Sequence, residues 1–309
     1  GEALIDFIPG QSGKKIKEVS EFHPVVGGAP ANVCGAFVKL GGHARMITQL
    51  GAGPFGDKIL DEFQTYGIDC TAVKRTDQAN TSLAFVALTE DGNREFSFYR
   101  KPGADMLLES SWIDPKWFED GCCLHFCSVS LGDYPMKEAH RKAIELARNA
   151  GMTISFDPNL RRPLWNDDEA LKKAVLEFLP LADILKISDE ELFFLTGCQT
   201  LEDAKPLLFQ GNVKLVIYTE GADGACACTR QVLARSPGIP VKAHDTTGAG
   251  DAFIGSFLYQ LYEHGTCSTD LSSLTQDELK SFLDFSNRYC ARSVQKKGAI
   301  ASYPEKNEM

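Results

Sequence analysis

The chain has 309 residues and a formal charge of −10, with 32 basic and 42 acidic side chains. This length suits one large α/β domain, and a hydrophobic share of 43% is enough for a sizeable core. Because the balance is acidic and no basic cluster stands out, we expect neither a nucleic-acid partner nor binding to an anionic membrane.

Ten cysteines are scattered through the chain, several of them in apolar runs where a thiol acts as a small hydrophobe. No Cys-x-x-Cys pair and no zinc spacing occurs, and a chain of this length folds without disulfides. No apolar run approaches the ~20 residues of a membrane span, and the opening does not have the pattern of a signal peptide. We therefore expect reduced core thiols in a cytoplasmic protein.

Two stretches in the first hundred residues have an extended character. Residues 6–19 are partly extended, and residues 81–100 hold two strand-like runs around Asp91-Gly92-Asn93, a strong hairpin signal. Together they predict a small β-sheet flap beside the main domain. The opening GEALID has the pattern of the end of a strand, which leaves open whether residues precede Gly1.

Between these stretches lies VVGGAPANVCGAFVKLGG, residues 25–42, which predicts a helix with Pro30 in its first turn. Gly27 and Gly28 permit a close approach of the backbone, and Asn32 offers both a donor and an acceptor. These groups suit the vicinal hydroxyls of a sugar. Taken alone, however, the segment favours the alternative interpretation, a tight turn in which Asn32 satisfies local backbone groups.

The next motif, GAGPFG at residues 51–56, matches the dinucleotide fingerprint G-x-G-x-x-G after a strand-like run. A true fingerprint opens a helix at the glycines in the first βαβ unit, with an acidic residue ~20 positions further on. Here Pro54 and Phe55 lie inside the motif, and we expect the following segment to lead to a β-hairpin rather than a second βαβ unit. A nicotinamide-dependent oxidoreductase is therefore disfavoured.

From about residue 122 the pattern alternates between strands and helices, which argues for a parallel sheet covered by helices. The predicted strands are 122–128, 152–157, 183–187 and 214–219, and the predicted helices are 136–151, 167–179 and 188–197.

Polar residues follow two of these strands. Asp157, Asn159, Arg161 and Arg162 end one strand, and the carboxyl ends of parallel strands form the usual ligand face. ISDEE, residues 187–191, ends another, and it has two interpretations: a capping box from Ser188 to Glu191, or a Glu191 that holds a water on Mg²⁺. Both stay open on the residues alone.

Near the end, DTTGAGDAFIGSF places Gly248, Ala249 and Gly250 at the start of a predicted helix and Asp251 in its first turn. Helix N-termini present free N–H groups to anions, and the glycines allow a close approach. An aspartate there can accept the proton of an attacking hydroxyl in phosphoryl transfer. The alternative is that Asp251 only complements the helix dipole, and residue chemistry does not decide between the two.

Together these motifs resemble the ribokinase-like (PfkB) family of carbohydrate kinases. GGAPANVCGAFVKLGG is similar to its first signature and DTTGAGDAFIGSF to its second, which is highly specific. The likeness covers nearly the whole chain, including GEALIDF, FYRKPGADMLL, DPNLRRPLW and KKGAIASYP, and is greatest to bacterial-type fructokinases. The 2-keto-3-deoxygluconate kinases, which share a version of DPNLR, are the nearest alternative.

The resemblance implies a three-layer α/β/α fold with a mostly parallel central sheet. Residues 1–309 would form one kinase domain, with a discontinuous β-sheet lid at about 6–22 and 80–103 over the sugar. It implies transfer of the ATP γ-phosphate to a sugar hydroxyl with Mg²⁺, fructose being the expected sugar. A catalytically silent sugar-binding or regulatory protein is a further alternative, against which the intact GAGD argues. Exposed strand edges of the lid make a homodimer through the lid plausible.

Site roles also follow from the resemblance. Asp251 would be the catalytic base, with the amides of Gly248, Ala249 and Gly250 as anion hole. The sugar-contacting positions would be Asp6, Gly28 and Asn32, with Gly27 and Arg161 beside them. The nucleotide-side positions would be Thr219, Gly221 and Asn287. A monovalent cation, K⁺, would lie at Asp245, Thr247, Ser293, Gly298 and Ser302. One departure is that the family's Asn-x-x-Glu is Ser188-Asp189-Glu190-Glu191 here, so the implied Mg²⁺ contact through water rests on Glu191.

Overall fold

The computed structural model describes residues 1–309 except 12, 89–93 and 266–269. Its centre is a six-stranded sheet in the order β12-β11-β10-β9-β8-β7. The four strands β7 to β10 run parallel, whereas β11 and β12 pair antiparallel. The strands are β7 (Cys123–Cys127), β8 (Thr153–Asp157), β9 (Ile184–Ser188), β10 (Leu215–Thr219), β11 (Gly224–Cys228) and β12 (Leu233–Pro237).

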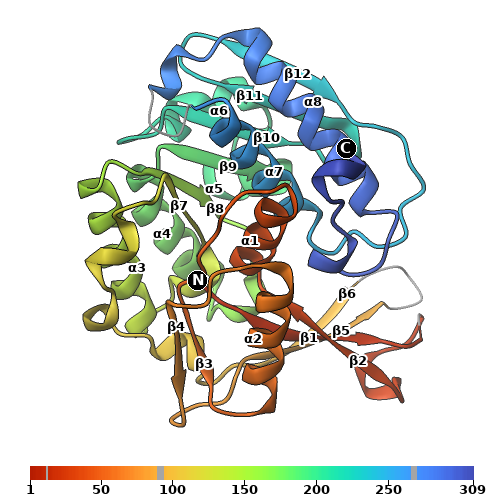
Figure 1. The fold of residues 1–309 in the computed structure, drawn as a ribbon. Coiled ribbons are helices and arrows are strands. Elements are labelled where there is room, and N and C mark those ends of the chain that lie inside the picture. Colours follow the sequence, from red (N-terminus) through yellow and green to blue (C-terminus); the bar gives the residue numbers. More distant parts are fainter. Residues whose placement is uncertain (12, 89–93, 266–269) are drawn as a thin grey trace.

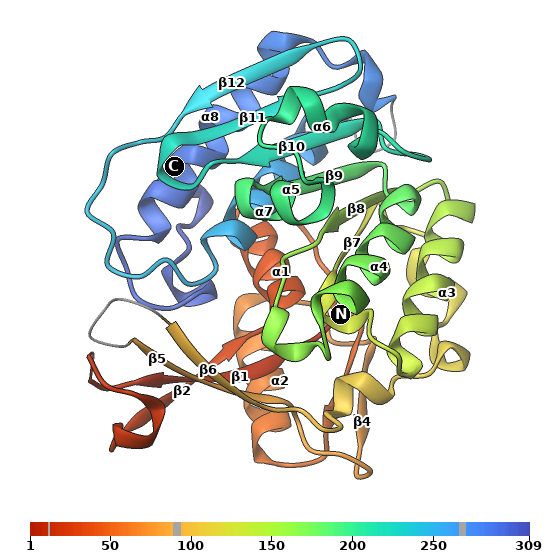
Figure 2. The same ribbon diagram turned by 180° about the vertical axis from the view of Figure 1, so that it is seen from behind.

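Helices cover both faces of this sheet, which gives the expected three layers (Figures 1 and 2). One face carries α3 (Pro135–Asn149), α4 (Asp168–Phe178), α5 (Asp189–Thr196) and α6 (Leu201–Leu208). The other carries α1 (Ala29–Lys39), α7 (Ala249–Glu263) and α8 (Gln276–Ser293).

Side chains alternate between the two faces along each buried strand. In β9, Leu185 and Ile187 pack into the α3–α6 core, and Ile184 packs into the α1–α7–α8 core. The same alternation directs Lys186 towards α1 and α7. The carboxyl ends of β8 and β9 therefore lie next to the first turn of α7.

A separate four-stranded sheet in the order β2-β1-β5-β6 lies to one side of the central sheet (Figure 1). Its strands are β1 (Leu4–Pro9), β2 (Phe22–Gly27), β5 (Leu83–Leu88) and β6 (Arg94–Tyr99). The predicted small sheet is therefore present, and it includes a strand that lies beyond residues 6–19, because β1 pairs antiparallel with β2, which runs to Gly27. The predicted turn at Asp91-Gly92-Asn93 lies outside the described residues.

The segment after Gly51 differs from its prediction. Strands β3 (Thr48–Gly51) and β4 (Val73–Thr76) pair in parallel and are joined by α2 (Pro54–Tyr66), so the motif GAGPFG does open the helix of a βαβ unit. The expectation of a hairpin directly after it was wrong. The turn is nevertheless filled from within, because the Arg75 guanidinium donates to the Gly51 carbonyl at 2.9 Å and to Asp57 at 2.7 Å. Dinucleotide binding stays disfavoured for this physical reason.

The nine cysteines within the described part of the chain are free, and Cys127, Cys226 and Cys228 are buried. Burial raises the pKa of the thiols of Cys226 and Cys228, to about 11 and about 12 respectively. Both thiols are therefore protonated at neutral pH and serve as small apolar side chains. Cys267 lies outside the described residues.

Candidate active site

The first turn of α7 is built around Gly248. Gly248 has a left-handed φ of 72°, and a side chain there would collide with the Tyr303 hydroxyl. That hydroxyl instead donates to the Gly248 carbonyl at 2.8 Å and fixes the turn. Of the three amides predicted to form an anion hole, that of Ala249 donates to the Thr246 carbonyl at 3.2 Å, a long bond within the turn.

Asp251 lies in this first turn, as predicted, and only 4% of it is exposed. Each of its carboxylate oxygens accepts a hydrogen bond from a side-chain amide. Asn32 of α1 donates at 2.8 Å and Asn159, from the loop after β8, donates at 3.0 Å. The carboxylate is therefore held in one orientation by two separate elements of the fold.

Asn159 has an unusual backbone that suits this role. Its φ of 43° is the single positive value among the described non-glycine residues, a conformation that asparagine tolerates better than most side chains. The Asp157 carboxylate accepts from the Asn159 amide at 3.1 Å and stabilises the turn. Sequence reasoning placed Asn159 at the ligand face but did not assign it a contact with Asp251.

Beneath the first turn of α7 lies a buried ion pair that sequence reasoning missed. The Lys186 ammonium lies 2.9 Å from Asp157, and the two residues are 5% and 0% exposed. The available signal was a lysine within the otherwise apolar run ILKI, because a lysine is rarely buried unless it is paired.

The electrostatics of the site are dominated by burial. Burial raises the pKa of the Asp251 carboxyl, and the hydrogen bond from Asn32 together with the charges of Arg161 and Lys186 opposes this rise. Burial likewise raises the pKa of Asp6 to about 7, against the charge of Arg161. A carboxylate with a raised pKa is a better proton acceptor than an exposed aspartate.

The predicted sugar-contacting residues converge on Asp251. The negative charge of Asp251 raises the pKa of Asp6 in β1, and the positive charge of Arg161 lowers the pKa of both carboxyls. A Cβ on Gly27 would collide with the Asp6 carboxylate, so only glycine leaves room for it. Gly28 has a φ of 107°, and a Cβ there would lie 2.7 Å from the Glu2 carbonyl.

The predicted nucleotide-side residues lie near the ends of β10 and β12. Thr219 ends β10 beside Ser188 of β9, and Gly221 follows with a φ of 55°. Asn287 of α8 is buried, and its amide donates to the Ser236 hydroxyl at 2.9 Å and to the Pro237 carbonyl at 3.1 Å. Its contacts in this structure hold the end of β12.

Three of the five predicted cation residues meet. The Asp245 carboxylate accepts from the Thr247 amide at 2.9 Å, from the Thr247 hydroxyl at 2.6 Å and from the Gly298 amide at 2.9 Å. The hydroxyls of Ser293 and Ser302 instead donate to carbonyls of their own segments. Within the described ranges, no cluster of three or more His, Cys, Asp or Glu residues could hold a metal ion.

Glu191 forms the predicted capping box. Its carboxylate accepts from the Ser188 amide at 2.8 Å, and its own amide donates to the Ser188 hydroxyl at 3.3 Å. The other carboxylate oxygen accepts from the Leu160 amide at 2.9 Å. Glu191 therefore connects the start of α5 to the loop that carries Asn159 and Arg161.

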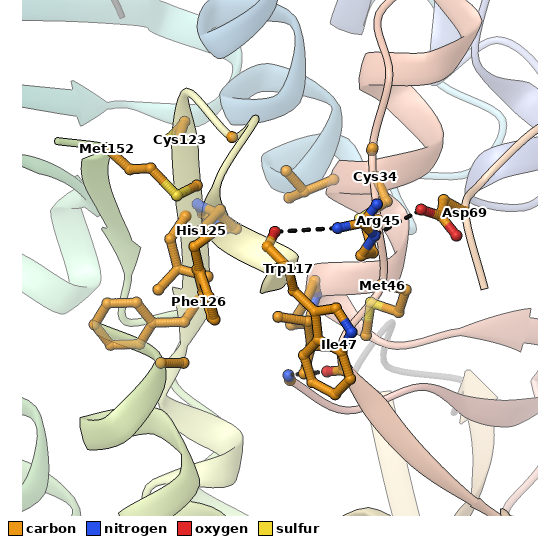
Figure 3. A pocket seen from close by; sticks show the side chains of 18 of the residues that line it. Cys34, Arg45, Met46, Ile47, Asp69, Trp117, Cys123, His125, Phe126 and Met152 are labelled. Carbon is orange, nitrogen blue, oxygen red and sulfur yellow. Dashed lines mark hydrogen bonds and ion pairs between the residues drawn. The ribbon is translucent and has the colours of Figure 1, made fainter. Parts of the chain in front are cut away.

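A separate pocket of about 510 Å³ lies between β7 and the segment before β3 (Figure 3). Its lining is largely apolar and contains none of the predicted site residues; Cys34, Met46, Trp117, Phe126 and Met152 are labelled there. His125 and His140 also line it, and burial lowers the pKa of each to about 3. Both imidazoles are therefore neutral at neutral pH, and the charged side chains of Arg45 and Asp69 in the lining pair with one another at 2.6 Å.

Comparisons with known proteins identify the family. A model of the pfkB family of carbohydrate kinases matches residues 1–306. The chain belongs to this family. The structure of this chain, within the residues that it describes, contains no helix that is long and apolar enough to cross a bilayer.

Relatives of this pfkB-family kinase include several fructokinases. The chain is 40% identical to probable fructokinase-5 of Arabidopsis thaliana, over 98% of this chain and 93% of the relative. It is also 40% identical to fructokinase-2 of Solanum lycopersicum, over 100% and 93%. A solved fructokinase of Xylella fastidiosa with bound ATP superposes with a TM-score of 0.91 at 34% identity, over 100% of this chain and 94% of that one. These matches confirm the ribokinase-like fold and the kinase class.

The contact between Gly27 and Asp6 gives a first prediction. Gly27→Ala forces the Asp6 carboxylate out of its present position, and we expect kcat/KM for the sugar to fall by about tenfold or more, because small misplacements of substrate-positioning groups are costly. Steady-state kinetics measure this effect. The matched control is Gly53→Ala, at a position where a Cβ has no atom within 4 Å. Equal kinetics for both variants would contradict the role of Gly27.

Proposed function

We propose that this kinase transfers the γ-phosphoryl group of ATP to fructose and forms fructose 6-phosphate. The observation that carries the proposal is the buried Asp251 carboxylate in the first turn of α7, oriented by two amides and flanked by Asp6 and Arg161. Fructokinases at 40% identity over nearly the full chain support fructose as the sugar. A fructokinase of Vibrio cholerae O395, described with fructose, ADP and calcium ion, has the same fold at 33% identity and a TM-score of 0.87.

In this mechanism Asp251 is the general base. The hydroxyl of the sugar attacks the γ-phosphorus while its proton passes to a carboxylate oxygen of Asp251, and the bond to ADP breaks. The amides of Asn32 and Asn159 occupy one lone pair on each oxygen and leave another for the incoming hydroxyl. The raised pKa of Asp251 brings its basicity closer to working pH.

The start of α7 supplies the anion hole. The amides of Gly248, Ala249 and Gly250 lie at the positive end of the helix dipole, next to the base. The N–H of Ala249, which donates a long hydrogen bond to the Thr246 carbonyl, would have to donate to the phosphoryl oxygen as well. Such donors act on charge that develops in the transition state, where they are most effective.

A buried acceptor at the proposed sugar site fits a polyol. Among the described residues no donor reaches Oδ1 of Asn32, although this atom is buried. A buried carbonyl oxygen is costly without a donor, and a sugar hydroxyl would supply one. The other proposed sugar contacts are Asp6, Gly27, Gly28 and Arg161.

For the nucleotide and metal we propose the family positions. Thr219, Gly221 and Asn287 would border ATP. Glu191 fits a contact to Mg²⁺ through water, because each of its oxygens accepts a hydrogen bond from one backbone amide and has a second lone pair for a water. Mg²⁺ would neutralise charge on the transferred phosphoryl group.

Arg161 supports a second candidate substrate. Its guanidinium is exposed and its charge acts on the sugar side of the site, where it could pair with the carboxylate of a sugar acid. This observation favours 2-keto-3-deoxygluconate as the alternative to fructose.

We also propose that the sheet β2-β1-β5-β6 is a lid over the sugar and the contact surface of a homodimer. Phe96 and Tyr99 of β6 are 36% and 64% exposed, and β2 and β6 are its edge strands. A monomeric mass by light scattering would exclude the dimer. The free thiols of the described residues fit a reducing, cytoplasmic compartment, which fractionation of the native cells would check.

A panel of sugars tests the substrate. ADP release is measured with fructose, ribose, 2-keto-3-deoxygluconate, glucose and adenosine, and we expect the highest kcat/KM on fructose. A higher value on any other compound would overturn the assignment, and a preference for 2-keto-3-deoxygluconate would support the role proposed for Arg161.

Replacing the base tests the mechanism. Asp251→Asn should lower kcat by ~10²–10⁴ because the amide does not accept the hydroxyl proton. The control is Asp277→Asn, which removes an exposed acid from the first turn of α8 and tests the dipole role alone. Activity of Asp251→Asn within tenfold of the wild type would exclude the base role.

The pH profile has a predicted sign as well. Asp251 acts when ionised, so kcat is present above its pKa and falls as pH decreases through it. Because burial raises that pKa, the acid limb should lie above the ~3.9 of an ordinary aspartate.

The cation site at Asp245, Thr247 and Gly298, with Ser293 and Ser302 near it, gives a further expectation. If K⁺ orders this loop beside the anion hole, replacing K⁺ by Na⁺ should lower kcat because the smaller ion needs shorter oxygen contacts. A solved structure of a double mutant of the Vibrio cholerae O395 fructokinase contains fructose, ADP and a potassium ion. Equal kcat values in K⁺ and Na⁺ at constant ionic strength would count against the site.

A further inference from the structure

The ion pair of Lys186 and Asp157 has no direct role in the proposed transfer of the proton or of the phosphoryl group. Lys186 is 5% exposed, and its side chain points from β9 towards α1 and α7. Burial, the largest single influence, would lower the pKa of Lys186, but the charges of Asp157, Glu191 and Asp251 and the hydrogen bond to Asp157 together raise it, so the side chain is an ammonium. An isolated buried charge is costly, and this cation is retained at the centre of the molecule.

The ammonium lies directly under the catalytic turn. Its Nζ is 3.3 Å from the position that a Cβ on Gly250 would occupy, so the lysine packs against the first turn of α7. Its partner Asp157 accepts from the Asn159 amide at 3.1 Å, and the Asn159 side chain donates to Asp251 at 3.0 Å. A continuous chain of contacts thus joins Lys186 to the proposed base.

We propose that Lys186 is a positioning residue for Asp251, acting through Asp157 and Asn159, and that its charge keeps the buried base ionised. The proposal rests on the role of Asp251 as the general base. Lys186 holds the Asp157 carboxylate, Asp157 holds the left-handed turn at Asn159, and Asn159 orients the Asp251 oxygen.

The charge of Lys186 acts in a crowded environment. The titratable groups that interact with Asp251 come from several elements: Asp6 from β1, Cys127 from β7, Asp157 from β8, Arg161 from the following loop, Lys186 from β9, Cys290 from α8, and Tyr303 from the C-terminal segment. Within this set, Arg161 and Lys186 are the two cations. Arg161 has the larger influence on the pKa of Asp251, but it is exposed to water and salt, whereas Lys186 is buried and its charge is screened less.

The main test is Lys186→Met, which keeps the length of the side chain and removes its charge. We expect kcat to fall by about ten- to a hundredfold with KM for fructose within about threefold, because the ground-state sugar contacts do not include Lys186. The acid limb of the kcat profile should move to higher pH, because loss of the nearby cation makes Asp251 harder to ionise. A merely structural lysine would lower stability and leave this limb unchanged.

Two further variants test the chain of contacts. Asn159→Gly keeps the left-handed backbone and removes the amide that reaches Asp251. If Lys186 acts through Asn159, the combined variant loses less kcat than the product of the single effects, whereas independent roles give the product. The pair Lys186→Met with Asp157→Asn leaves no unpaired buried carboxylate, and it replaces the single variant if that one does not fold.

A matched control lies at the other end of the same strand. Arg148 pairs with Asp183, just before β9, at 3.4 Å, so Arg148→Met removes an ion pair without approaching Asp251. It should leave the acid limb in place. Wild-type kcat and limb in a folded Lys186→Met protein, or failure of the paired variant to fold, would overturn the proposal. If Asp251→Asn is also active, the base role itself fails; if only Lys186→Met is wild-type-like, the failure belongs to Lys186 alone.

Discussion

The proposed site depends on keeping one carboxylate ionised and immobile in the interior of the protein. Asp251 is 4% exposed, and an aspartate in such a place ordinarily becomes neutral. The fold counters this with two amide donors, a nearby buried ammonium and the positive end of α7. These contributions come from α1, the loop after β8, β9 and α7, which the α/β sandwich brings to one point.

The balance of charges at the site is acidic, like that of the whole chain. Asp6, Asp157, Glu191 and Asp251 lie together, and Arg161 and Lys186 do not fully compensate them. Burial raises the pKa of both Asp6 and Asp157 to about 7. For these groups the folded state binds more protons than the unfolded state between their ordinary pKa and about 7, so the free energy of unfolding falls as pH rises through that window. At neutral pH these carboxylates therefore lower the stability of the fold, and a bound cation or substrate can offset this cost.

Local sequence patterns were sufficient for the motifs and for the alternation of the central sheet. The glycines before Asp251 and the Gly27-Gly28 pair carry recognisable backbone demands, and the strands 122–128 and 152–157 were bounded by helix signals. The pairing of β1 with β2 was not predicted and the βαβ unit after Gly51 was misjudged, because register and strand partners depend on contacts between distant segments.

Lys186 shows most clearly what local sequence patterns leave undetermined. One lysine in a five-residue strand has no local signature of function, and its meaning depends on Asp157, 29 positions earlier, and on the first turn of α7. Such a residue is visible only once the strands are placed side by side. A charged side chain in a buried strand is a sequence signal that something must pair with it, but the partner is set by topology.

The separation of the parts along the chain has a consequence for how the site forms. Asn32 and Asp251 are 219 residues apart and Asn159 and Asp251 are 92 apart, yet both amides reach the same carboxylate. Contacts of such long range form only when the sheet, α1 and α7 have docked. Until then Asp251 is an ordinary hydrated aspartate with neither a raised pKa nor a fixed orientation. The proposed base is thus a property of the completed fold, and any change that loosens the packing of α1 or β8 against α7 reaches the chemistry through this one carboxylate.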